Sequence, residues 1–138
     1  MRRFDWHLLT TAAFATILAA AFVTAPARAD DWPTRPVTIV VPFGAGGNTD
    51  TMARLAAQDL SEKFSQNFIV ENRPSPGGVL GTRAVVEAAP DGYTLLFCAS
   101  SMITLTPQLQ KLEFDPAKQL VPITNVGTGA QVLSLIHI

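Results

Sequence analysis

The chain has 138 residues, of which 48% are hydrophobic and 15% are charged, and its formal net charge is −1. This balance, without a cluster of Lys and Arg, excludes the basic surface typical of a nucleic-acid binder. The single cysteine, Cys98, excludes an internal disulfide, and its apolar neighbours favour a small buried hydrophobe. The only histidines, His7 and His137, lie near the two ends, so no histidine base or metal-ligand spacing is present in the body of the chain.

The N-terminus has the layout of a secretory signal peptide. Arg2 and Arg3 precede an apolar stretch at 8–23, and a small-residue A-R-A motif ends at Ala29. The alternative is a retained membrane anchor, because about 16 apolar residues is near the lower limit of a membrane span. We predict a signal peptide at 1–29, cleaved after Ala29, and therefore an exported protein.

A strand, a glycine turn and a helix follow in that order. Residues 37–41 are a continuous apolar run, which is typical of a strand covered on both faces. Residues 49–64 have an apolar stripe at helical spacing. Asn48 or Thr49 is the predicted N-cap, and Asp50 lies in the first turn, where negative charge is favoured.

The same alternation continues along the chain and predicts an α/β fold. The further elements are a strand at 68–70, a helix at 79–88, a strand at 94–99, a helix from 100 that Pro107 breaks, and a strand at 120–126. A βαβαβ order implies a mainly parallel sheet with right-handed crossovers.

In such a sheet, ligands bind beyond the carboxyl ends of the strands. Three loops rich in glycine or serine lie there, at 42–50, 72–82 and 100–101. Helix N-termini present free N–H groups to an anion, although the glycines alone could simply permit tight turns. The predicted ligand-binding residues are Gly46, Gly47, Asn48, Thr49, Asp50, Gly77, Gly78, Ser100 and Ser101.

One alternative is an exported Rossmann-like dinucleotide-binding domain of an oxidoreductase. Residues 44–49 approximate the G-x-G-x-x-G pattern, and Glu71 is placed as a ribose-binding acid would be. The match is incomplete, because Thr49 replaces the third small residue. A Walker A loop and the G-x-S-x-G elbow are absent from the sequence, and an exported protein would not ordinarily meet a soluble nicotinamide cofactor.

Three motifs, at 32–50, 70–82 and 88–96, resemble the solute-binding proteins of tripartite tricarboxylate transporters, the Bug or TctC-like family. The resemblance implies a periplasmic, monomeric Venus-flytrap protein of two α/β lobes, without a cofactor, metal or enzymatic activity. It would capture a small carboxylate-bearing solute between the lobes and deliver it to membrane transporter subunits.

The resemblance also implies an incomplete first lobe at 30–126, with most of the second lobe missing. Residues 127–138 would be the start of the crossover to that lobe or a non-native tail, since 133–138 fit the family poorly.

A bound carboxylate would accept N–H hydrogen bonds from the loops at 46–50 and 100–101. A second carboxylate beside an anion site is awkward, so we expect Asp50 to face away or to accept from an amino or hydroxyl group of the ligand. Three arginines, Arg54, Arg73 and Arg83, are either counter-charges or solvated surface residues. Tyr93 is expected to pack at the start of its strand.

Overall fold

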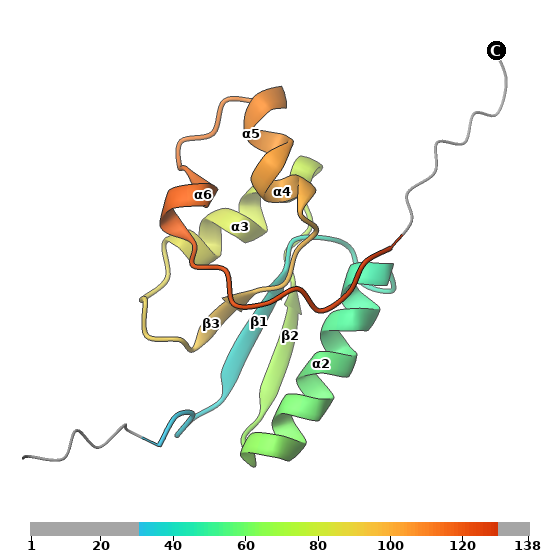
Figure 1. Ribbon diagram of the computed structural model, residues 1–138, viewed down its shortest axis with the longest axis vertical. Helices are drawn as coiled ribbons and strands as arrows, with labels where there is room; N and C mark the ends of the chain where they lie inside the picture. The colour runs from blue at the N-terminus through green and yellow to red at the C-terminus, as the bar shows by residue number, and fades with distance from the viewer. Residues whose placement is uncertain (1–30, 130–138) are drawn as a thin grey trace, which may run out of the picture. The chain divides into compact units, whose positions relative to one another are not determined.

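The computed structural model describes residues 31–129 (Figure 1). The signal peptide predicted at 1–29 and the last part of the tail predicted at 127–138 lie outside the described residues. The elements are β1 (Val37–Val41), α2 (Asn48–Phe64), β2 (Phe68–Asn72), the 3₁₀ turn η1 (Pro76–Gly78), α3 (Val79–Val86), β3 (Thr94–Leu96), α4 (Ser101–Thr104), α5 (Thr106–Leu109) and α6 (Pro116–Gln119).

The three strands form a parallel sheet in the order β2-β1-β3, as Figure 1 shows. Val40 lies opposite Glu71 of β2 and opposite Leu96 of β3, so the carboxyl ends of the strands are level. The predicted α/β fold with a parallel sheet is confirmed. The loops that follow the strands therefore leave the sheet at one edge.

Strand β1 is buried on both faces, as its apolar sequence predicts. Val37, Ile39 and Val41 pack with Ala53 and Ala57 of α2 in the hydrophobic core. Val40 points to the opposite face and is only 2% exposed. Because β2 and β3 flank β1 on opposite sides, right-handed crossovers place α2 and α3 on opposite faces of the sheet.

Helix α2 begins one residue earlier than predicted, and its cap differs from the prediction. The N-cap is Gly47, in an extended conformation and without a side-chain cap hydrogen bond. The prediction of Asn48 or Thr49 as the cap is therefore wrong. The helix ends at Phe64, its C-cap Ser65 adopts the left-handed conformation, and Lys63 in the last turn complements the helix dipole.

The strand predicted at 120–126 is wrong. Residues 120–129 have no regular secondary structure, and Val121 and Ile123 are 87% and 77% exposed. Figure 1 shows this segment running past the sheet toward the start of α2. A Cβ at Gly127 would lie 3.4 Å from Cε of Met52. The segment is apolar in sequence, but it pairs with no strand among residues 31–129.

Other boundaries move by a few residues. Strand β2 extends to Asn72, whereas β3 stops at Leu96, although Phe97 N–H still donates to Val40 O at 2.9 Å. The helix predicted from 100 divides at Leu105, and Pro107 lies in the first turn of α5. Within residues 31–129, no helix has the length and apolar character needed to cross a membrane.

Candidate functional site

The first turn of α2 offers a set of free backbone donors. The first intrahelical hydrogen bond runs from Thr51 N–H to Gly47 O at 2.9 Å. The N–H groups at 48–50 precede it, and Gly47 supplies no side-chain cap. Gly46 to Asn48 are exposed. These three donors lie at the positive end of a 17-residue helix, where Asn48 is exposed, Thr49 is half-buried and Asp50 is buried.

Asp50, in that same turn, is turned inward rather than toward solvent. Its side chain is buried, and the residue is only 3% exposed. The backbone N–H of Gly46 donates to its Oδ2 at 2.8 Å. Of the two expectations for Asp50, the structure favours the one in which the carboxylate faces away, because its oxygens already accept hydrogen bonds within the chain. The N–H of Gly46 is likewise already engaged within the chain.

Two side chains complete the environment of this carboxylate. Arg54 donates from Nε to Oδ2 and approaches Oδ1 with its terminal nitrogen, both at 3.0 Å. Asn72, the last residue of β2, donates from Nδ2 to Oδ1 of Asp50 at 2.9 Å and to Phe43 O at 3.2 Å. Arg54 also donates to Oδ1 of Asn72 at 3.0 Å. The three side chains form a closed ring.

The ring fixes the charge of Asp50. Hydrogen bonds from Arg54, from the Gly46 N–H and from Asn72 lower the pKa of the carboxyl from 3.8 to about 2. Asp50 is therefore ionised at neutral pH, and the bidentate guanidinium pairs its charge. Sequence reasoning placed Asn72 at the start of the second loop but gave it no role. The i,i+4 spacing of Asp50 and Arg54 was the one local signal of their pairing.

The second predicted loop is held by packing. Gly77 and Gly78 have positive φ angles of 62° and 71°, which glycine tolerates best. Gly78 is buried, and its N–H donates to Ser75 O at 2.9 Å. A Cβ on Gly78 would lie 2.6 Å from Sδ of Met102 and 3.1 Å from Cβ of Pro42. The N–H of Gly78 thus already has a hydrogen-bond partner. Because Gly78 has no side chain, the second loop can pack closely against Met102 and Pro42.

The third loop begins the short helix α4. The carbonyl of Ser100 accepts from Ile103 N–H and Thr104 N–H at 3.0 and 3.1 Å. Its hydroxyl makes no cap hydrogen bond, and Ser100 is exposed whereas Ser101 is half-buried. Met102 of this helix packs against Gly78 of the second loop. Within residues 31–129, no hydrogen bond joins Ser100 or Ser101 to the first loop.

The arginines considered as counter-charges are all paired within the chain. Arg73 contacts Glu71 at 2.7 Å, and Arg83 contacts Glu87 at 2.7 Å and Glu113 at 2.9 Å. Glu71, the acid of the dinucleotide alternative, is thus held by Arg73. No group of three metal-ligating side chains occurs between residues 31 and 129.

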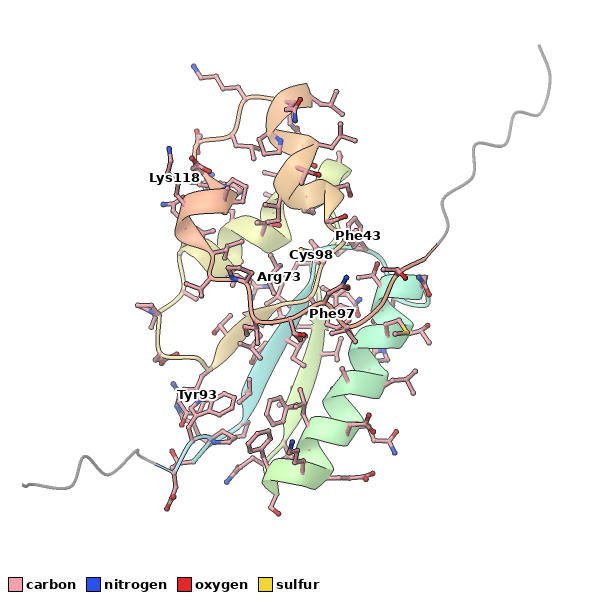
Figure 2. All side chains as sticks on the ribbon, in the orientation of Figure 1. Phe43, Arg73, Tyr93, Phe97, Cys98 and Lys118 are labelled. Atoms are coloured by element: carbon pink, nitrogen blue, oxygen red, sulfur yellow. The ribbon has the colours of Figure 1, made fainter. Side chains whose placement is uncertain are left out.

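Two remaining side chains were assigned packing roles. Tyr93 packs against the core, as predicted. Cys98 is only half-buried, and burial raises the pKa of its thiol. Figure 2 shows Phe43 and Cys98 near the carboxyl end of the sheet and Tyr93 at the opposite end.

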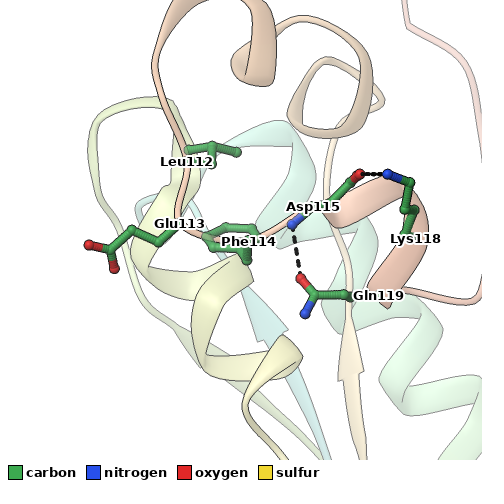
Figure 3. A pocket seen from close by; sticks show the side chains of 6 residues that line it. All are labelled: Leu112, Glu113, Phe114, Asp115, Lys118 and Gln119. Carbon is green, nitrogen blue, oxygen red and sulfur yellow. Dashed lines mark hydrogen bonds and ion pairs between the residues drawn. The ribbon is translucent and has the colours of Figure 1, made fainter.

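Two hollows in the described surface lie away from these loops. One, of about 470 Å³, is lined by Leu112, Glu113, Phe114, Asp115, Lys118 and Gln119 (Figure 3). Its polar groups bond to each other: Lys118 pairs with Asp115 at 3.0 Å, and Gln119 accepts from the Asp115 N–H at 2.9 Å. The other, of about 240 Å³, lies between α2 and β2. Neither contains a predicted ligand-binding residue.

Comparison with known proteins identifies the family. The sequence profile described as "Tripartite tricarboxylate transporter family receptor" (TctC) matches residues 52–136. Protein BugT of Bordetella pertussis is 40% identical over 121 residues, which are 84% of this chain and 36% of BugT. A solved periplasmic transporter superposes with a TM-score of 0.60 at 37% identity, over 63% of this chain and 30% of that structure.

A second solved structure, MatC from Rhodopseudomonas palustris with bound malate, superposes with a TM-score of 0.54 at 38% identity. The match covers 64% of this chain and 30% of MatC. The chain thus spans about a third of the length of the relatives that it matches. The profile match and these sequence identities show that the chain belongs to the TctC family of solute-binding receptors, which includes the Bug proteins.

Proposed function

We propose that this chain is the ligand-gripping part of a periplasmic protein that captures a small carboxylate-bearing solute and delivers it to a tripartite membrane transporter. The observation that carries this proposal is the first turn of α2, where the N–H groups of residues 48–50 have no partner within the helix. Family membership supports it, and so does the malate bound to the related MatC.

A carboxylate suits this turn for two physical reasons. Its two oxygens can accept from several N–H donors at once, and such charge-assisted bonds are worth roughly 1.5–3 kcal/mol each. The dipole of α2 adds a favourable field at the same point. Gly47 has no side chain, so a ligand can approach the backbone closely. Ser100 and Ser101 are proposed as hydroxyl donors from the third loop.

Backbone donors recognise a carboxylate group and not the molecule attached to it. The choice among solutes therefore falls to side chains elsewhere in the whole protein. Closure of a second lobe over the site would bury the ligand by a hinge motion. We infer that the present chain alone holds carboxylates far more weakly than a two-lobed relative does.

The test is a titration followed by amide NMR, which detects weak binding. Malate, succinate and a monocarboxylate are added to the chain, and NAD is added to a parallel sample. We expect carboxylates to shift the amides of residues 47–50, with affinities weaker than micromolar. A shift caused by NAD alone would favour the dinucleotide-binding alternative. No response of these amides to any carboxylate would overturn the assignment of the site.

A further inference from the structure

The ring of Asp50, Arg54 and Asn72 lies directly beneath the first loop and joins elements that are distant in sequence. Asp50 and Arg54 come from the first two turns of α2, and Asn72 ends β2. Asn72 also holds the carbonyl of Phe43, just beyond β1, at 3.2 Å. Among the described residues, no buried side-chain nitrogen or oxygen lacks a hydrogen-bond partner, so the ring is internally satisfied.

The ring has an electrostatic consequence for the turn above it. An ionised carboxylate in the first turn of a helix would repel an anionic ligand at the same N-terminus. Here the Asp50 side chain is only 4% exposed and is paired with Arg54, whose side chain is 52% exposed. The negative charge is thus directed inward, away from the exposed backbone of Gly47 and Asn48.

The ring also has a geometric consequence. Gly46 has a φ of +82°, and its N–H is held by Asp50 at 2.8 Å. Asn72 in turn holds Asp50 at 2.9 Å and ties it to the end of β1 through Phe43. The loop is therefore fixed before any ligand arrives, which lowers the ordering cost of binding.

Resting on the function proposed above, we propose that Asn72 is a positioning residue of the carboxylate site. It does not touch the ligand. It supplies the neutral amide that keeps Asp50 pointing away from the ligand and fastened to Gly46, so that the N–H groups at 48–50 are presented to an anion without a competing charge. The amide matters because it donates to Asp50 and accepts from Arg54 at once.

Asn72→Asp tests this role, since it keeps the side chain's shape and replaces the donor with a second carboxylate. The charged groups around that position are Asp50 and Arg54 from α2, and Glu71 with Arg73 from its own strand end. Strand β1 contributes no titratable side chain. At neutral pH the two carboxylates repel each other, so we expect the affinity for malate to fall at least tenfold.

The pH profile separates positioning from simple damage. As the pH falls, one proton shared by the two carboxyl groups restores a donor in the ring. The ratio of variant to native affinity should therefore recover at lower pH. Because the ratio is taken at each pH, the titration of malate itself cancels. Asn67→Asp, at an exposed position just before β2, is the matched control, and its ratio should stay flat near one.

A readout without ligand distinguishes this inference from the proposed function. Hydrogen exchange of the Gly46 amide should be slow in the native chain and at least tenfold faster in Asn72→Asp at neutral pH. If native chain binds no malate, the proposed function fails, yet this exchange still reports whether Asn72 orders the loop. Arg54→Lys, which keeps the charge but loses the bidentate geometry, should accelerate Gly46 exchange less. Asn72→Leu, which has a similar volume but can neither donate nor accept, should also accelerate Gly46 exchange, and it carries the test if Asn72→Asp does not fold.

Two results would overturn the role of Asn72. One is native-like malate affinity and Gly46 exchange in Asn72→Asp at neutral pH. The other is a loss of affinity whose ratio to native does not change with pH, because a purely structural defect would not recover on protonation.

Discussion

The backbone N–H of Gly46 donates to the carboxylate of Asp50, four residues further on, at 2.8 Å. The glycine loop is thus closed by a side chain of the helix that it introduces. An acidic residue that would hinder anion binding instead serves the loop's own structure. This relationship makes the behaviour of the loop depend on the ionisation of Asp50.

Asp50→Asn should remove an acid-dependent part of the chain's stability. The pKa of Asp50 is lowered to about 2, mainly by the hydrogen bond from Arg54. A lowered pKa in the folded state contributes stability that is present above about pH 4 and is lost as the pH falls toward 2. We expect urea midpoints of the native chain to fall through this window, and those of the variant to fall less.

The control is Asp59→Asn, an exposed position on the same helix. Its stability profile between pH 5 and 2 should follow that of the native chain within about 0.5 kcal/mol. Identical profiles for Asp50→Asn and native chain would contradict the assigned role of the Asp50 carboxylate.

Gly47→Val should abolish carboxylate binding without unfolding the chain. Gly47 has φ −75° and ψ 167°, a conformation open to any residue. A Cβ there would lie 3.5 Å from the Gly44 carbonyl oxygen, which is ordinary contact. The branched side chain would instead cover the N–H groups of the first turn. Calorimetric titration with malate, in a protein that carries both lobes, measures the loss.

The matched control is Gly44→Val. A Cβ at Gly44 meets no atom within 4 Å, so this variant adds the same side chain to the same loop. We expect it to retain binding. Unchanged affinity in Gly47→Val, with thermal unfolding like that of the native chain, would refute the anion site at this turn.

The sequence was a good guide wherever the determining interactions are local. The apolar run at 37–41 predicted β1, because a strand that is buried on both faces is apolar at every position. The apolar stripe at 49–64 predicted α2, because a helix that is buried on one face repeats its apolar residues every three or four positions. Ser65 and Pro107 mark boundaries whose details depend on caps and turns, so those predictions moved by a few residues. The level edge of the sheet followed from the βαβ order alone.

Predictions failed where a distant partner decides the outcome. Val121 and Ile123 have the alternation of a strand, but a strand requires a neighbour, and the segment pairs with none in 31–129. Likewise, no sequence pattern near Asp50 predicts its hydrogen bond with Asn72, which is 22 residues away. The close approach of Gly78 and Met102 likewise joins residues that are distant in sequence, so Gly78, which we predict to be a ligand contact, also has a packing role.

Tyr93→Phe should cost roughly 0.5–1 kcal/mol of stability. The Tyr93 hydroxyl accepts from Thr34 N–H at 3.1 Å, and exposed neutral hydrogen bonds contribute amounts of this size. The Arg35 guanidinium lies 3.8 Å from the ring centroid, and Phe retains that stacking. Tyr93→Ala removes both contacts together with core packing, so we expect a loss of roughly 2 kcal/mol or more. Equal losses for both variants, measured by urea denaturation, would contradict this division.

Gly78→Ala should destabilise the chain by about 2–4 kcal/mol. The left-handed conformation, with φ 71°, costs an L-residue about 1–2 kcal/mol. The added methyl would also meet Met102 Sδ at 2.6 Å and Pro42 Cβ at 3.1 Å, and overpacking of this kind typically costs about 1–3 kcal/mol. Gly44→Ala, in open space, is the control and should change the urea midpoint little. Shortening Met102 to Ala in the Gly78→Ala background should recover part of the steric cost but none of the backbone cost. A double-mutant cycle that shows no coupling between the two positions would mean that Gly78 is required for its backbone conformation alone.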